Sequence, residues 1–150
     1  MMNKNIRIAL YTRCSGPEAQ PSLEHQEARL RATVEARFSG GCEIVRVYRD
    51  VGPCGRDLPG WRRLVESIIA HEVEVVAVAS LDRVSRDVRR VAEKLRVFQD
   101  HRAHLFSAAE SFDTSAALGR VMLNLLLAFA DCEPDPDTNY IDPSGARPSR

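Results

Sequence analysis

The sequence predicts a three-layer α/β/α domain built on a doubly wound, mostly parallel sheet of four to five strands. Short apolar runs with strand character alternate with amphipathic helical patterns along most of the chain, and this alternation is typical of parallel α/β folds. The run from Val75 to Ala79 contains only valine and alanine, as expected of a central strand buried on both faces. The 150 residues suffice for one globular core, so we expect a single domain.

The first three elements are predicted within residues 6–48. Residues 6–11 are apolar and β-prone at most positions, and Gly16-Pro17 follows them, which indicates a strand and then a loop. A helix is expected next, with Ser22 as its N-cap and an apolar face that extends to Phe38. Residues 43–48 alternate in polarity and predict the second strand.

The middle of the chain continues the alternation. Asp57 is the expected N-cap of a second helix, whose apolar residues follow the i, i+3, i+4, i+7, i+8 spacing of a buried face. Residues 73–79 predict the third strand, residues 103–107 the fourth and residues 109–113 a fifth strand at the edge. The inward-facing residues expected are Trp61, Leu64, Val65, Ile68 and Ile69 in the second helix, and Val88, Val91, Leu95 and Phe98 in the third.

The last predicted helix, residues 115–131, is long and apolar on nearly every side. Such a helix is expected either in the centre of a large protein or in an oligomer interface, and for a small domain we favour the interface. The residues expected in that interface are Val121, Leu125 and Phe129.

The composition changes after Cys132. Residues 133–150 are rich in proline and aspartate and poor in apolar residues, so we expect residues 1–132 to form the domain and residues 133–150 to be a disordered tail. The formal net charge is zero, but residues 131–150 hold five acids and two arginines. Residues 1–130 therefore carry 19 basic against 16 acidic side chains, a net of +3.

Several classes of protein and site are disfavoured by the sequence. The longest apolar run, residues 121–130, is too short to cross a bilayer, and the amino end does not resemble a secretion signal. We therefore expect a cytoplasmic protein. The four cysteines and four histidines show no metal-ligand spacing, so we expect free thiols and no metal.

Two predicted strand ends carry the polar side chains that indicate chemistry. Arg13 and Ser15 follow the first strand, and Asp82, Arg83 and Arg86 follow the third. Adjacent parallel strands bring such groups to one edge of the sheet. A serine among arginines, without a nearby histidine in sequence, is poorly suited to acyl transfer but suits attack on a phosphodiester, because arginine stays charged and stabilises the growing negative charge.

Each of these signals has a less specific interpretation. A serine after a strand is more often a turn residue or cap, and an Asp-Arg pair is more often a surface ion pair. A thiol phosphatase is disfavoured because Gln20, Tyr48 and Gly60 stand six residues after Cys14, Cys42 and Cys54, where such loops need arginine. A nucleotide-binding phosphate loop is disfavoured because its Gly-x-x-x-x-Gly-Lys signature is missing.

Taken together, the motifs resemble the catalytic domain of the serine site-specific recombinases, the resolvases, invertases and integrases. The likeness covers about residues 6–132. The matching segments are Tyr11-x-Arg13-x-Ser15, Ser22-Leu23-x-x-Gln26, Asp50-x-Gly52 with Gly55 and Pro59-Gly60-Trp61, Leu81-Asp82-Arg83-Val84-Ser85-Arg86, and Glu110-x-x-Asp113-Thr114 with Gly119-Arg120.

The resemblance implies strand breakage and rejoining of double-stranded DNA. Ser15 would attack the scissile phosphate and become joined to the 5′ end, and strands would exchange in a homo-oligomer, a dimer or tetramer held by the last helix. The family needs neither metal nor nucleotide cofactor. Carried over to this sequence, the phosphate-holding residues are Arg13, Arg83 and Arg86, with support from Asp82, Gln20, Arg56 and Arg120.

The sequence also departs from the family pattern. Leu58 stands where the family has a phosphate-binding arginine, and Pro134 follows Glu133 where the last helix normally continues toward a DNA-binding domain, which we expect to be absent. The alternative is therefore a truncated, catalytically impaired remnant that acts as an oligomerisation or interaction module. A small-molecule binder is the third possibility, disfavoured because no apolar pocket residues cluster with the arginines.

Overall fold

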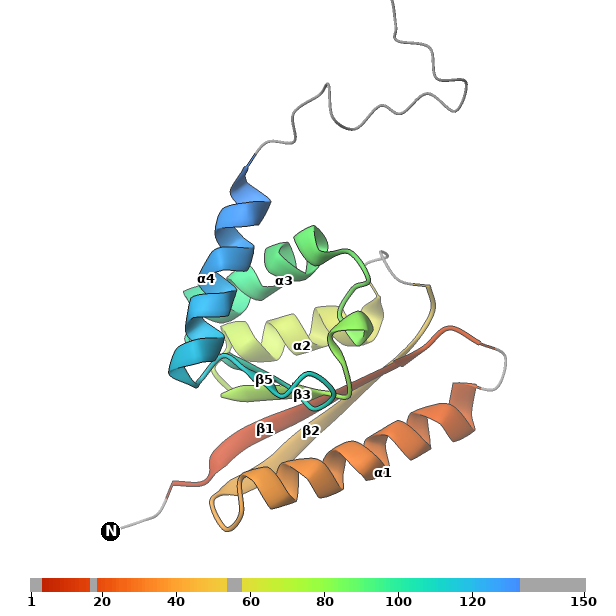
Figure 1. The fold of residues 1–150 in the computed structure, drawn as a ribbon. Coiled ribbons are helices and arrows are strands. Elements are labelled where there is room, and N and C mark those ends of the chain that lie inside the picture. Colours follow the sequence, from red (N-terminus) through yellow and green to blue (C-terminus); the bar gives the residue numbers. More distant parts are fainter. Residues whose placement is uncertain (1–3, 17–18, 54–57, 133–150) are drawn as a thin grey trace, which may run out of the picture.

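The computed structural model describes residues 4–16, 19–53 and 58–132. One five-stranded sheet forms the centre of the domain, and Figure 1 shows helices on both of its faces. The strand order is β2-β1-β3-β4-β5; the first three pairings are parallel and β5 runs antiparallel to β4. The strands are β1 (Ile6–Cys14), β2 (Cys42–Val51), β3 (Val75–Val78), β4 (His104–Ser107) and β5 (Phe112–Asp113).

The helices complete the three layers that the sequence predicts. Figure 1 shows α1 on one face of the sheet and the other three helices on the opposite face. The helices are α1 (Ala19–Arg37), α2 (Pro59–Ile69), α3 (Val88–Asp100) and α4 (Ala117–Asp131). The α/β fold and its strand alternation are therefore confirmed.

β1 divides the core into two clusters because successive side chains of a strand point to opposite faces. Ala9 and Tyr11 belong to the larger cluster beneath α2, α3 and α4, which also contains Trp61 and Phe98. Ile8 and Leu10 belong to the smaller cluster, with Leu30 and Val34 of α1. β1 is thus buried on both faces as far as Arg13, the residue at which the candidate site begins.

Two predicted helix starts differ in the structure. α1 begins at Ala19, so Ser22 lies inside the helix and the prediction that it is the N-cap is wrong. Pro21 is tolerated there because N–H groups of a first turn have no partner within the helix. Asp57 lies outside the described residues, and the N-cap of α2 is Leu58, which makes no side-chain capping bond.

The N-terminus of α2 is capped instead by Asp50, at the end of β2. Its carboxylate accepts hydrogen bonds from the backbone N–H of Gly60 at 2.7 Å and of Trp61 at 2.9 Å. Asp50 is 4% exposed and also accepts from the Tyr11 hydroxyl at 2.9 Å. One buried carboxylate thus joins β1, β2 and α2, three elements that are separate in the sequence.

Two residues predicted to face inward are exposed instead. Ile69 is 49% exposed and Val88 is 52% exposed. Each lies at a helix end, Ile69 at the end of α2 and Val88 at the start of α3. Helical periodicity predicts the direction of a side chain but not how far the neighbouring layer extends.

α4 starts at Ala117, slightly later than predicted, and it packs closely against the strand before it. A Cβ atom added to Gly119 would lie 1.7 Å from the carbonyl oxygen of Asp113. Leu123 and Leu127 of α4 are buried in the larger cluster. Among the described residues, no helix is long and apolar enough to cross a membrane.

Candidate active site at the carboxyl edge of the sheet

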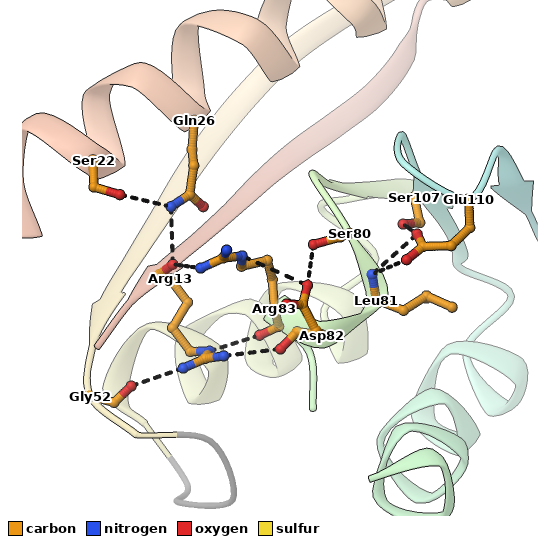
Figure 2. Close-up of polar contacts among 10 residues, drawn as sticks. All are labelled: Arg13, Ser22, Gln26, Gly52, Ser80, Leu81, Asp82, Arg83, Ser107 and Glu110. Carbon is orange, nitrogen blue, oxygen red and sulfur yellow. Dashed lines mark hydrogen bonds and ion pairs between the residues drawn. The ribbon is translucent and has the colours of Figure 1, made fainter. Parts of the chain in front are cut away.

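The candidate site lies where β1 and β3 end side by side. Tyr11 pairs with Val78 in the parallel ladder, so the residues after each strand emerge at the same edge of the sheet. A short 3₁₀ turn, η1 (Leu81–Arg83), follows β3. The structure thus brings Arg13 together with Asp82 and Arg83, as Figure 2 shows.

Arg13 joins three segments of backbone. Its Nε donates to the carbonyl of Arg83 at 3.1 Å, its Nη2 to the carbonyl of Asp82 at 2.9 Å, and its Nη1 to the carbonyl of Gly52 at 3.0 Å. The residue is 4% exposed. Because the planar guanidinium presents its donors in fixed directions, these bonds hold η1 and the end of β2 against β1.

Arg83 in turn bonds to the backbone of Arg13. Its Nη1 donates to the carbonyl of Arg13 at 2.8 Å, and its Nε lies 3.8 Å from the Asp82 carboxylate. About a third of the Arg83 side chain, 32%, is exposed. Arg13 and Arg83 therefore each donate a hydrogen bond to the other's backbone carbonyl. Of the two side chains, that of Arg83 is the more accessible to solvent or to a ligand.

Gln26 of α1 holds the same peptide from the other face. Its Nε2 donates to the carbonyl of Arg13 at 3.2 Å and to the Ser22 hydroxyl at 3.3 Å (Figure 2). The sequence motif contains Gln26 but does not by itself indicate this role. The available signal was the spacing of four residues from Ser22, which places both side chains on one face of a helix.

The environment of Cys14 favours negative charge beside Ser15. A backbone hydrogen bond from Gly16, a hydrogen bond with the Ser22 hydroxyl and the charge of Arg83 together lower the pKa of the Cys14 thiol, against the opposing effect of burial. Ser15 itself is exposed. Backbone donors and the positive charge of Arg83 therefore lie next to the Cys14 thiol, one residue before Ser15.

Asp82 and Arg86 line a cavity of about 480 Å³ between η1, α3 and α4. Both residues are exposed. The remaining lining residues are Leu81, Ser85, Val88, Val91 and Leu126. The cavity gives Arg86 an open approach.

Of the three supporting residues expected from the sequence, the structure describes the side chain of Arg120 but not those of Gln20 and Arg56. Gln20 lies in the first turn of α1, and its side chain is outside the description; Arg56 lies outside the described residues. Arg120 is exposed in the first turn of α4. Leu58, at the position of the missing arginine, is the N-cap of α2.

The described part of the chain holds no group of three or more histidine, cysteine, aspartate or glutamate side chains arranged to bind a metal ion. Its three cysteines, Cys14, Cys42 and Cys132, are free thiols. The polar groups at the sheet edge are therefore arginines, carboxylates, hydroxyls and a thiol.

The comparisons with known proteins define the class of this protein. The family model described as "Resolvase, N terminal domain" matches residues 8–136. The chain therefore belongs to this family of serine recombinase catalytic domains, and the resemblance found in the sequence is confirmed.

Individual relatives agree with this assignment. The N-terminal catalytic domain of TP901-1 integrase superposes with a TM-score of 0.71 at 33% identity, covering 82% of this chain and 92% of that one. A resolvase family site-specific recombinase from Streptococcus pneumoniae gives a TM-score of 0.69 at 29% identity, covering 85% and 87%.

Among curated proteins, the DNA-invertase hin of Salmonella typhimurium is 29% identical over 98 residues, 65% of this chain and 50% of that protein. An integrase-like protein of Sinorhizobium fredii, y4lS, is 26% identical over 107 residues, 71% of this chain and 57% of that protein. The chain thus spans about half the length of these curated relatives.

Proposed function

We propose that this domain breaks and rejoins DNA strands in site-specific recombination through a phosphoserine link at Ser15. One observation carries the proposal: an exposed serine directly follows β1, and Arg13 of that strand is bonded to the turn that bears Asp82 and Arg83, in a chain of the resolvase family. A DNA substrate also favours the cytoplasmic location expected from the sequence.

In the proposed reaction, the Ser15 oxygen attacks the scissile phosphorus and the bond from phosphorus to the 3′ oxygen breaks. Ser15 loses its proton and the 3′ oxygen gains one, so the products are a 5′ phosphoserine and a 3′ hydroxyl. Rejoining is the reverse attack by a 3′ hydroxyl. The phosphoester keeps the bond energy, and no fuel is needed.

The residues at the sheet edge are proposed to have different roles in this reaction. Arg83 and Arg86 offer accessible charge to the phosphate, and Asp82 exchanges the proton with the leaving oxygen. Arg13, which is 4% exposed, is proposed to add its positive charge to theirs while it bonds to the carbonyls of Asp82 and Arg83. Gln20, Arg56 and Arg120 are retained as proposed supports of the DNA phosphates.

A suicide DNA substrate, whose cleaved end is lost, tests this function. At low salt and high protein concentration, wild-type protein is expected to form a covalent adduct that survives denaturing electrophoresis, and Ser15→Ala to form none. Low salt matters because a net charge of +3 on residues 1–130 provides few phosphate contacts.

Ser39→Ala is the matched control, since Ser39 is also exposed but follows α1 at the opposite end of that helix. It should form adduct at the wild-type rate. Absence of adduct from wild-type protein, or persistence of adduct in Ser15→Ala, contradicts the proposal.

Self-association through α4 is the second proposed property. Five large apolar side chains of this helix are between 46% and 72% exposed: Leu118, Val121, Met122, Leu125 and Phe129. Apolar side chains gathered on one helix mark an interaction surface. We propose that a second copy of the chain covers this face, giving the homodimer or tetramer that strand exchange requires.

A further inference from the structure

The carboxylate of Glu110 contacts the turn that carries Asp82 and Arg83, from the opposite side to Arg13 (Figure 2). Both of its oxygens lie 3.3 Å from the backbone nitrogen of Leu81, 29 residues earlier in the chain. One of them also accepts a hydrogen bond from the Ser107 hydroxyl. Glu110 thus joins the end of β4 to the first residue of η1.

The Leu81 N–H has no carbonyl partner within its own turn, because the first N–H groups of a helical turn lie before any carbonyl that could accept from them. An N-cap side chain normally accepts from the second or third N–H of the turn rather than from the first. In η1 the N-cap Ser80 makes no capping bond, and its hydroxyl bonds to the Asp82 carboxylate. Glu110 is therefore the acceptor found for the first N–H of η1.

The segment that carries Glu110 is itself fixed to the sheet. The N–H of Ala108 donates to the carbonyl of Val78 at 3.0 Å, and the N–H of Ala109 donates to the carbonyl of Ala79 at 2.9 Å. These bonds extend the pairing of β4 with β3 beyond the end of both strands. The backbone next to Glu110 is consequently held against the strand from which η1 emerges.

We propose that Glu110 is a positioning residue for the cleavage reaction: it fixes η1 so that Asp82 and Arg83 meet the scissile phosphate in one orientation. It acts through Leu81, with Ser107 orienting its carboxylate, and it does not contact DNA. Arg13 holds the carbonyls of the same turn while Glu110 holds its first N–H. The inference rests on the function proposed above.

Two variants and one control test the proposal on the full chain. Glu110→Gln replaces one acceptor oxygen by a donor, and Ser107→Ala removes the orienting hydroxyl without changing charge. Glu93→Gln is the control, because Glu93 is exposed on α3, away from this turn. Since Glu110 is exposed, its substitution is expected to leave the fold intact.

The first measurement needs no DNA. Amide hydrogen exchange at Leu81 is expected to become about tenfold faster in Glu110→Gln, the factor that corresponds to one hydrogen bond of ordinary net strength. Ser107→Ala should shift it in the same direction by less, and Glu93→Gln should leave it unchanged. Unchanged exchange at Leu81 in Glu110→Gln overturns the proposal.

The second measurement follows adduct formation on the suicide substrate as a function of DNA concentration. The maximal rate is expected to fall about tenfold in Glu110→Gln, with the half-saturating DNA concentration within twofold of wild type. If the half-saturating DNA concentration changes while the maximal rate does not, the Glu110 carboxylate acts only through its charge. That result would overturn the proposal that Glu110 positions η1. If wild-type protein forms no adduct, the proposed function fails, and exchange at Leu81 alone decides whether Glu110 fixes the turn.

Discussion

At the scale of single residues, buried polar side chains decide how the loops at the sheet edge are arranged. Arg13 satisfies three backbone carbonyls and Asp50 satisfies three donors, and each residue is 4% exposed. A buried charge is tolerated only with such partners. Substitutions that leave those partners unpaired are therefore expected to cost more than the loss of one surface contact.

Asp50→Ala should destabilise the domain strongly. It leaves the Tyr11 hydroxyl and the N–H groups of Gly60 and Trp61 without their acceptor, and we expect the free energy of unfolding to fall by about 3 kcal/mol. Urea denaturation measures the change. Asp100→Ala, an exposed control, should shift it by less than about 0.5 kcal/mol; an equal effect of both substitutions would contradict the role of Asp50.

The lowered pKa of Cys14 predicts a specific pH dependence. Because a lower pKa gives more thiolate at a given pH, alkylation of Cys14 by iodoacetamide should reach its half-maximal rate at a lower pH than for an unperturbed thiol. Ser22→Ala removes one of the stabilising hydrogen bonds and should move that midpoint to higher pH. Peptide mass spectrometry separates Cys14 from the other cysteines, and an unmoved midpoint would contradict the contact with Ser22.

At the scale of elements, glycine allows α4 to pack against the end of β5. The closeness of Gly119 to the Asp113 carbonyl leaves no room for a side chain, and Asp113 also accepts an ion-pair contact from Arg37 of α1 at 3.1 Å. The position of α4 thus depends on one residue without a side chain.

Gly119→Ala is expected to lower the free energy of unfolding by about 3 kcal/mol, since the new methyl group must displace either α4 or the backbone at Asp113. Gly41→Ala is the matched control because a Cβ there meets no atom within 4 Å. Thermal unfolding of both variants gives the comparison. A midpoint for Gly119→Ala as high as that of Gly41→Ala would show that α4 does not pack as closely as described.

At the scale of the whole molecule, α4 uses one face for the core and leaves the opposite face to solvent. Leu123 and Leu127 are 7% exposed, whereas Leu125 is 65% exposed. These two faces explain why the sequence of α4 is apolar on nearly every side. One face packs inside the domain, and the other is available to a partner.

Self-association should therefore be abolished by charge on the outer face of α4. Wild-type protein is expected to sediment as a dimer or larger species at high concentration, and the double variant Val121→Asp with Leu125→Asp as a monomer, because a buried unpaired charge is costly. Glu66→Lys on the exposed face of α2 is the control. A wild-type protein that stays monomeric at every concentration would rule out this interface.

The sequence by itself determined the order of strands and helices along the chain, the polar residues that follow β1 and β3, and the family. These features depend on local periodicity and on residues close together in the chain. Two local predictions were wrong: Ser22 is not an N-cap because α1 already begins at Ala19, and Val88 is not a core residue because it lies exposed at the start of α3.

Only the tertiary structure decided which polar groups meet. Asp50 caps a helix that begins nine residues later, Gln26 reaches the carbonyl of Arg13, and Glu110 reaches Leu81 from 29 residues away. β1 shifts its register on β2 between Ile8 and Ala9, and this shift places Arg13 opposite Asp50. Such contacts depend on how strands align across the sheet, and strand alignment is a property of the packed fold rather than of any one segment.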